Sequence, residues 1–328
     1  MAKLLVTGGA GYVGSHTLRA LLAAGHDAVV LDDLRAGRAD FTDGAELVRA
    51  DCGDASALER LFRAHGPFEG VLHFAGSIQV AESMREPLAY YQNNVSASVA
   101  LLGACVRENV SAFVFSSSAA VYGHPEAQPI PEDAPLAPLS PYGASKAMVE
   151  RMLDDTAAAH GLRYAALRYF NASGADPAGG LGECHEPETH LIPLALQAVA
   201  GTGPALRLFG DDWPTRDGSC ERDYVHVSDL GEAHRLALEA LLAGEAGGAF
   251  NLGTGAGHTV REVIAAVERA AGRPVPAEAA PRRPGDPAAL VADTTRFRTR
   301  FGWTPKHSDL DTIVRTAWAW ERQRGDGV

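Results

Sequence analysis

Residues 3–14 read KLLVTGGAGYVG, and this stretch decides the fold. The run at 3–7 is short and apolar and ends in glycines, as a buried strand does. Apolar residues at helical spacing follow at 15–24, and a second apolar run occupies 28–31. A strand, a glycine turn, a helix and a second strand in this order form one βαβ unit.

The same alternation continues along the first half of the chain. Further strands are expected at 46–48, 70–74, 112–116 and 163–168, with helices at 55–65, 87–109 and from Pro141 onward. Continuous apolar strands separated by helices predict a parallel sheet that is covered on both faces. We therefore predict a Rossmann-type doubly wound parallel sheet, accompanied by a smaller mixed α/β substrate-binding domain.

The composition changes near residue 172, where glycine, proline and acidic residues begin to dominate. We expect a dinucleotide-binding Rossmann domain over residues 1–172, to which the chain returns near 224–255. The smaller domain is expected mainly over 173–328. A chain of 328 residues suits two such domains.

Overall charge and cysteine content exclude several classes of protein. The net charge of −12 repels phosphate backbones, so no nucleic-acid partner is expected. The four cysteines are scattered without metal-ligand spacing, which predicts reduced thiols and no metal. The sequence has no secretory leader pattern and no apolar run of roughly 20 residues. These features predict a cytoplasmic protein without a membrane partner.

The glycines at positions 8, 11 and 14 follow the spacing G-x-x-G-x-x-G, which departs from the standard G-x-G-x-x-G. A side chain at these positions would keep the backbone away from a pyrophosphate. The following helix offers free N–H groups and the positive end of its dipole. The turn therefore predicts a dinucleotide-phosphate site.

Acidic residues at the ends of the next two strands indicate which dinucleotide binds. Asp32 can accept hydrogen bonds from the adenosine ribose and would repel a 2′-phosphate, which favours NAD over NADP. Arg35 lies close enough in sequence to leave NADP open. Asp51 either binds the adenine amino group or only shapes a turn.

The segment SPYGASK at 140–146 contains Y-x-x-x-K, which places Tyr142 and Lys146 on one face of a helix. A phenol titrates near pH 10 in water, so a base at neutral pH needs a nearby positive charge. Lys146 and an oxidised nicotinamide would both supply one. Ser118 ends a core strand, where ligands bind in open α/β sheets, and can hydrogen-bond a substrate oxygen.

Together these motifs resemble the UDP-galactose 4-epimerase family of extended short-chain dehydrogenases. The resemblance covers nearly the whole chain. The stretches that carry it are VTGGAGYVGSH (6–16), LHFAGS (72–77), YYQNNV (90–95), FSSSAAVYG (115–123), SPYGASKAMVE (140–150), LRYFNASGADP (167–177), CERDYVHVSDL (220–230), FNLGTG (250–255) and PRRPGD (281–286).

The resemblance implies a role for each matching residue. Tyr142 is implied to be the catalytic base, Lys146 its electrostatic partner and Ser118 its hydrogen-bonding aid. The implied NAD-binding set is Gly8, Gly11, Tyr12, Val13, Gly14, Asp32, Asp33, Asp51, Cys52, Phe74, Ala75, Gly76, Asn93, Tyr142, Lys146 and Phe170. The implied substrate-binding set is Ser118, Tyr142, Asn171, His190, Leu191, Phe209, Arg222, Arg283, Asp286 and Leu290.

Three features, the first of them a pair of residues, distinguish the chain from some family members. Ser77 and Ile78 stand where some members have a Leu-Lys pair, so a lysine contact to the cofactor is missing. His190 replaces an Asn. Leu290 occupies a position that limits bulk at the sugar C2, which favours UDP-galactose and UDP-glucose over N-acetylated sugars.

The resemblance implies interconversion of UDP-galactose and UDP-glucose through a 4-keto sugar, by an enzyme that acts as a homodimer. A related dehydratase would need an Asp-Glu pair after Ser118, where the chain has Ala119 and Ala120. An epimerase of another nucleotide sugar stays open. A non-catalytic NAD-binding sensor is the alternative from another class, against which the intact catalytic residues argue.

Overall fold

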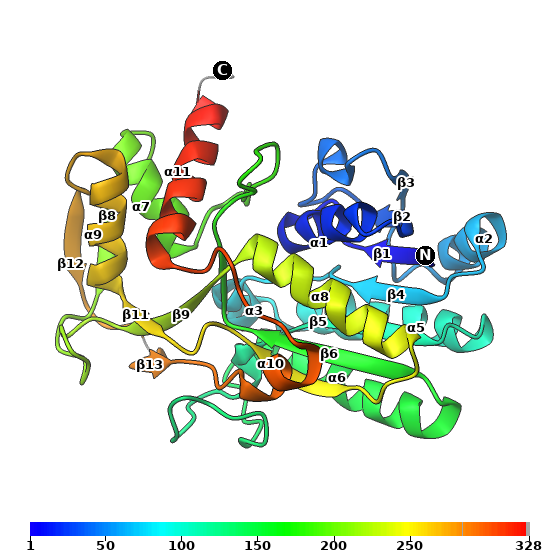
Figure 1. Ribbon diagram of the computed structural model, residues 1–328. Helices are drawn as coiled ribbons and strands as arrows, with labels where there is room; N and C mark the ends of the chain where they lie inside the picture. Colours follow the sequence, from blue (N-terminus) through cyan, green and yellow to red (C-terminus); the bar gives the residue numbers. More distant parts are fainter. Residues whose placement is uncertain (284, 326–328) are drawn as a thin grey trace.

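The computed structural model describes residues 1–283 and 285–325. A seven-stranded sheet forms the larger part of the molecule, and a smaller part is built on sheets of four and two strands (Figure 1). Every strand pairing in the larger sheet is parallel. The predicted Rossmann-type fold is confirmed.

The large sheet has the order β10-β6-β5-β4-β1-β2-β3. Its strands are β1 (Lys3–Thr7), β2 (Asp27–Asp32), β3 (Glu46–Arg49), β4 (Gly70–His73), β5 (Ala112–Ser118), β6 (Arg163–Tyr169) and β10 (Gly248–Leu252). The chain runs outward from β1 in one direction through β2 and β3, and in the other through β4 and β5. The crevice at the carboxyl ends of β1 and β4 is therefore the switch point where doubly wound sheets bind ligands.

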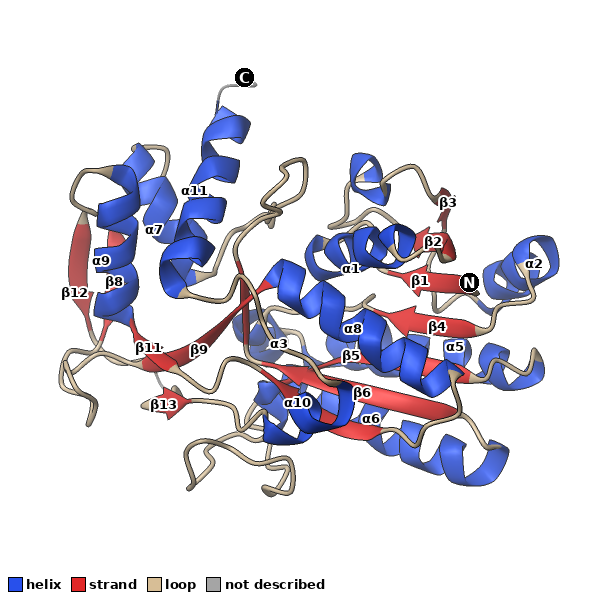
Figure 2. Ribbon diagram, viewed as in Figure 1, coloured by secondary structure: helices blue, strands red, loops and turns tan. Residues whose placement is uncertain are grey.

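Alternate side chains of each strand enter two separate cores. In β1, Leu4 and Val6 face a core shared with helices α1, α8 and α10, whereas Leu5 faces a core shared with α2, α5 and α6. The helices on the first face are α1 (Tyr12–Ala23), α8 (Val227–Leu242) and α10 (Thr295–Phe301). Those on the second face are α2 (Ala55–His65), α5 (Ala97–Arg107) and α6 (Pro141–His160). Both sides of the sheet are thus covered, as Figure 2 shows for the helices around the red strands.

The helical stretch predicted at 87–109 is continuous but not uniform. It consists of α4 (Pro87–Tyr90), a π-helical segment η2 (Tyr91–Ser96) and α5, after α3 (Val80–Arg85). The extra residue per turn in a π segment changes the direction of the side chains that follow, and such segments are frequent at functional sites. Short 3₁₀ turns, η1 (Ala39–Thr42) and η3 (Ala119–Val121), follow two of the large-sheet strands.

The smaller part combines segments from the second half of the chain. Its strands are β7 (Asn171–Ser173), β8 (Leu206–Phe209), β9 (Glu221–His226), β11 (Gly257–Thr259), β12 (Ala277–Ala280) and β13 (Ala289–Leu290). Helices α7 (Leu191–Ala200), α9 (Val260–Ala271) and α11 (Leu310–Gly325) surround a third apolar core. Strand β9 belongs to this part, whereas α8, which follows it directly, packs on α1. The cavity described next lies where the two parts meet.

Within the described residues, no helix is both long enough and apolar enough to cross a membrane.

Candidate active site

A cavity of about 1480 Å³ extends from the carboxyl ends of the large-sheet strands into the smaller part. Its walls include the glycine turn after β1, the ends of β2 and β5, helix α6, and the loops around β8 and β9. All of the residues predicted to bind NAD line it. So do all of those predicted to bind substrate except Leu290.

The glycine turn leaves no room for side chains. A Cβ at Gly8, whose φ is +70°, would lie 2.4 Å from the backbone N of Ala75. A Cβ at Gly14 would lie 2.2 Å from the carbonyl oxygen of Gly8. Gly11 is the N-cap of α1 and provides no capping side chain, so the first N–H groups of α1 have no capping partner there. This cradle fits a pyrophosphate, and the residues present therefore fit a dinucleotide.

Asp32 is fixed at the end of β2 by the backbone. Its Oδ2 accepts from the Ala10 N–H at 3.0 Å and its Oδ1 from the Leu34 N–H at 2.9 Å. Burial raises the pKa of the carboxyl group, although these backbone hydrogen bonds partly offset the effect. An oriented carboxylate at this place can receive the two ribose hydroxyls of a dinucleotide.

Arg35 links three residues that were predicted separately. Its Nε lies 2.5 Å from Asp33 Oδ2, its Nη2 donates to Asn93 Oδ1 at 2.9 Å, and Nη2 lies 3.5 Å from Asp51 Oδ2. The guanidinium is thus held among acidic partners at the adenosine end of the cavity. It is directed toward Asp33 and Asp51, which leaves it less free to bind a 2′-phosphate.

Asn94 was not predicted from the sequence, yet it shapes the loop after β4. Its Oδ1 accepts from the Ser77 N–H at 2.8 Å, and its Nδ2 donates to the Ser77 carbonyl and to Ser145 Oγ, both at 3.0 Å. The π segment η2 carries both Asn93 and Asn94. It therefore connects the loop at Gly76–Ser77 to helix α6, which carries the catalytic candidates.

The predicted catalytic residues converge at the start of α6 and the end of β5. Ser140 caps α6 by accepting from the Gly143 N–H, and Pro141 occupies the first turn, as predicted. Lys146 Nζ donates to the Ser116 carbonyl at 2.8 Å and lies 5.8 Å from the centre of the Tyr142 ring. Ser118 ends β5 and accepts from the Ala120 N–H. All three side chains reach the same cavity.

Burial shifts the pKa values of both Tyr142 and Lys146. The pKa of Tyr142 is raised by burial, and hydrogen bonding to Ser118 lowers it only in part. The pKa of Lys146 is lowered by burial to about 8, although the charge of Glu150 acts in the opposite direction. The predicted downward shift of the tyrosine is therefore not produced by Lys146 and the other protein groups alone. The chain supplies the position of the phenol, and further positive charge must come from what binds beside it.

A buried polar network that the sequence analysis missed supports this site from behind. Glu150 lies one turn after Lys146 and pairs with Arg168 of β6 at 2.6 Å, with each side chain only 6% exposed. Glu150 also accepts from Ser117 Oγ at 2.5 Å. Ser117 precedes the strand-end Ser118, so the network connects β5, β6 and α6. The sequence signal was a Glu four residues after the lysine of Y-x-x-x-K.

The opposite end of the cavity carries cationic and aromatic groups from the smaller part. Arg283 stacks on Phe209 with its Cζ 3.8 Å from the ring centre. Arg222 on β9 donates through Nη1 to the Glu221 carbonyl at 2.8 Å, and Asn171 Nδ2 donates to the Asp223 carbonyl at 3.0 Å. Guanidinium groups and an aromatic ring on one wall can hold a diphosphate and a flat base.

The remaining predicted residues lie at different depths. Asp286, His190 and Leu191 line the cavity wall. Leu290 pairs with Arg222 through β13 and packs against the small apolar cluster that contains Ala119, Val121 and Tyr122. Leu290 therefore does not line the cavity, and the limit on bulk at sugar C2 stays a prediction.

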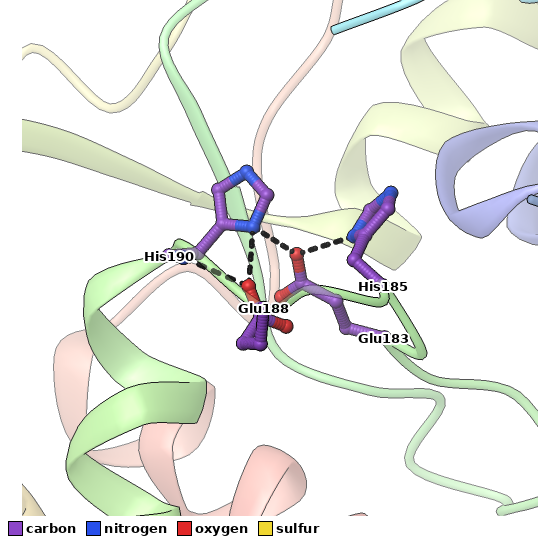
Figure 3. Close-up of side chains that lie close together, drawn as sticks. All are labelled: Glu183, His185, Glu188 and His190. Atoms are coloured by element: carbon purple, nitrogen blue, oxygen red, sulfur yellow. Dashed lines mark hydrogen bonds and ion pairs between the residues drawn. The ribbon is translucent and has the colours of Figure 1, made fainter. Parts of the chain in front are cut away.

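His190 is surrounded by residues that the sequence analysis did not select. Glu183, His185 and Glu188 place their polar atoms within 4.8 Å of one another and of His190 (Figure 3). The alternation of Glu and His in ECHEPETH at 183–190 was the available signal. Nothing in its spacing indicated that the chain would bend so that all four side chains meet.

Comparison with known proteins agrees with this geometry. The model of the NAD dependent epimerase/dehydratase family matches residues 4–253. The UDP-glucose 4-epimerase of Azospirillum brasilense is 54% identical, and the match covers 99% of this chain and 94% of that protein.

Two solved structures share the whole fold. The UDP-glucose 4-epimerase of Brucella ovis in complex with NAD has a TM-score of 0.95 and 46% identity, covering 97% of this chain and 98% of that one. The enzyme of Bifidobacterium longum in complex with NAD⁺ and UDP has a TM-score of 0.93 and 35% identity, covering 99% and 100% of the two chains.

Proposed function

Since the chain belongs to the NAD dependent epimerase/dehydratase family, we propose that its cavity is the site where UDP-galactose and UDP-glucose are interconverted with NAD. This activity makes the enzyme an isomerase. The observation that carries the assignment is the convergence of Tyr142, Lys146 and Ser118 on one cavity with the glycine cradle and the Arg222–Arg283 wall. The relatives named above match this chain over almost its full length.

The residues divide the chemistry between them. The cradle at Gly8, Gly11 and Gly14 would hold NAD, and a bound nicotinamide would supply reversible hydride exchange with sugar C4. Tyr142 takes the proton of the C4 hydroxyl and later returns it. Ser118, which adjoins the phenol, hydrogen-bonds the same substrate oxygen. Lys146 is held by the Ser116 carbonyl, so its ammonium stays beside the tyrosine.

The nucleotide end of the substrate must be held more firmly than the sugar. Arg222, Arg283, Phe209 and Asn171 line the cavity, where the two guanidinium groups would grip the diphosphate and the other two side chains would contact the uridine. A tightly held UDP with a loosely held sugar allows the 4-keto sugar to turn over within the cavity. This arrangement explains how one site can act on both faces of C4.

Two alternatives differ in specific residues. A dehydratase needs acidic side chains after the strand-end hydroxyl, whereas Ala119 and Ala120 form the first turn of η3 there. An epimerase acting on UDP-N-acetyl sugars would need more space at sugar C2 than the bulky Leu290 is expected to leave, because in the family this position limits bulk there. We therefore favour the unsubstituted sugars.

The decisive experiment is incubation of the purified protein with UDP-galactose and no added NAD, followed by an assay for UDP-glucose. Conversion is expected, because a cofactor that ends each cycle unchanged can stay bound. If NAD is found in the protein but no conversion occurs, the protein is a cofactor-binding sensor and the proposed activity is wrong. The same assay with UDP-N-acetylgalactosamine determines the sugar specificity.

A homodimer is proposed on the face formed by α4, α5 and α6. Leu88, Val99 and Met148, one from each of these helices, are exposed large apolar side chains. Helix α6 contacts both α4 and α5, and exposed apolar side chains on neighbouring helices favour association with another copy. Light scattering of the wild type and of Val99→Glu tests this, with a shift toward monomer expected for the variant.

The cytoplasm is proposed as the compartment, because all four cysteines are free thiols in the structure.

A further inference from the structure

The loop before α7 brings an unusual set of charges to the cavity wall. His190 Nδ1 lies 2.7 Å from Glu183 Oε1 and 2.8 Å from Glu188 Oε1, and His185 Nδ1 lies 3.0 Å from the same Glu183 oxygen. The side chains of both glutamates are only 7% exposed, whereas that of His190 is 43% exposed. Two buried carboxylates thus share one partly exposed imidazole (Figure 3).

These distances indicate a shared proton rather than a shared metal ion. Ligand atoms around a tetrahedral ion with bonds of about 2.0–2.1 Å lie about 3.3 Å apart. The N–O distances of 2.7 and 2.8 Å around His190 are those of charge-assisted hydrogen bonds. Nδ1 must therefore carry a hydrogen, because it faces two acceptors.

The second ring nitrogen of His190 faces the other way. In Figure 3 it points away from both carboxylates, and it has no hydrogen-bond partner among the described residues. His190 lines the same cavity as Arg222 and Arg283. An imidazolium at this place has one N–H for the glutamates and one N–H for a ligand.

The electrostatics favour the charged form. Burial alone would lower the pKa of His190, but the hydrogen bonds and charges of Glu183 and Glu188 raise it to about 10. Burial would likewise raise the pKa of Glu183, but the hydrogen bonds from His185 and His190 lower it below its usual range. A raised histidine pKa means that the cation persists through neutral pH and is lost only as the pH rises toward about 10.

We propose that Glu183 and Glu188 are positioning residues that hold His190 as an imidazolium, so that its outer N–H is a cationic donor to the substrate diphosphate. This inference rests on the proposed function, because it takes the ligand of this wall to be a nucleoside diphosphate. Without the glutamates, His190 would be neutral for much of the working pH range and would lose most of its attraction for phosphate.

No other titratable or charged group described near the loop takes the place of Glu183 and Glu188 beside the His190 imidazole. Tyr12 of α1 has its hydroxyl on the Gly174 carbonyl, and burial first, then Glu183 and Glu188, raises its pKa, so it stays neutral. From α11, Arg324 donates to the Glu183 carbonyl, and burial raises the pKa of Glu321, an effect that Arg324 partly offsets. On the loop itself His185 pairs with Glu183. The two carboxylates that contact the imidazole directly are Glu183 and Glu188.

The test uses UDP as the ligand and the NAD-loaded protein, with affinity measured by calorimetry between about pH 7 and about pH 9. In Glu188→Gln, the amide oxygen can still accept from the N–H groups of Thr189 and His190, so the change removes charge and little else. Wild-type affinity is expected to change little over this range. The affinity of Glu188→Gln is expected to fall by about tenfold as His190 loses its proton.

Glu186→Gln is the matched control, because it removes the same charge from the same loop at an exposed position. It should keep the wild-type profile. His190→Asn should bind UDP with little dependence on pH, and adding Glu188→Gln to it should introduce none. If Glu188→Gln and the wild type have the same profile, the inference is wrong. It is also overturned if EDTA or added Zn²⁺ alters wild-type UDP affinity, since a metal would then bridge the cluster.

The failure of this inference can be told apart from failure of the proposed function. Conversion of UDP-galactose by the wild type, together with identical pH profiles, overturns only the role of the glutamates. Absence of conversion, together with the expected profile of Glu188→Gln, overturns the epimerase activity but keeps a nucleotide site governed by His190.

Discussion

One cluster of carboxylate and cation lies behind the cavity and another lines it, and they differ in whether the cation keeps an N–H group for a ligand. Beneath the catalytic helix, Arg168 gives Nε and Nη2 to Glu150 and Nη1 to Tyr122 and the Glu132 carbonyl. On the substrate side, His190 gives only one nitrogen to its two glutamates. The Arg168 guanidinium therefore donates to groups within the protein and fixes their positions. The His190 imidazolium keeps one N–H group that can donate to a ligand.

This difference predicts different consequences when each cluster is broken. A buried and fully satisfied pair, once broken, leaves an unpaired charge in the interior and costs stability. A pair at a cavity wall, once broken, changes the charge that a ligand meets and costs affinity. The catalytic residues stand between the two, since Lys146 packs next to the first cluster while Tyr142 faces the ligand.

The largest effect is expected from Tyr142→Phe. Loss of the proton-transferring hydroxyl should lower kcat by about 10²–10⁴-fold, because that is the usual contribution of a positioned acid–base group. Binding of NAD and UDP should be nearly unchanged. Steady-state kinetics and calorimetry measure both, and Tyr164→Phe, which removes a hydroxyl that pairs with Asp154, is the control. Wild-type kcat in Tyr142→Phe would contradict the assignment of the base.

Breaking the buried pair should come next. Arg168→Ala leaves the Glu150 carboxylate buried without its partner, so the free energy of unfolding should fall by about 3–5 kcal/mol. Urea denaturation followed by circular dichroism measures the change. A loss below about 1 kcal/mol, the size of a surface pair, would show that water reaches Glu150 and that the network does not fix the site.

The buried lysine should produce a pH-dependent effect of intermediate size. Its pKa is lowered to about 8 in the folded state, so the unfolded chain binds the proton more tightly and wild-type stability rises as pH increases from about 8 toward 10.5. Lys146→Met removes the charge. The variant should be more stable than the wild type by up to about 3 kcal/mol near pH 7, and the difference should shrink toward pH 10.5. A difference that is independent of pH in urea titrations would refute the buried charge.

The smallest effect is expected from an exposed pair on the same helix as Glu150. Arg151 and Asp155 pair at 3.0 Å, but their side chains are 77% and 64% exposed. Arg151→Ala should leave both the urea midpoint and kcat unchanged, because water competes for both charges. A clear loss of stability in Arg151→Ala would mean that solvent exposure does not explain why the Arg151–Asp155 pair should matter less than the buried Glu150–Arg168 pair.

Much of the fold and of the catalytic site could be predicted from local patterns. Apolar runs marked the strands of the first half, and the Pro141 start signal placed α6 correctly. The spacing of Tyr142 and Lys146 required only helical geometry. The π segment η2 had no such signal, and the hydrogen bonds of its Asn94 join residues that are 17 and 51 positions away along the chain. The division into two domains at residue 172 stays a prediction.

The sequence by itself determined the βαβ order, the glycine cradle and the helical spacing of the residues proposed to perform the chemistry, because each depends on neighbours within a few positions along the chain. Only the tertiary structure decided which distant groups meet. Glu150 of α6 meets Arg168 of β6 because α6 packs against β5 and β6, and His190 meets Glu183 and Glu188 through a bend in an irregular loop. Burial and the charged partners together then set the charge of each group, and both depend on how the whole chain is packed.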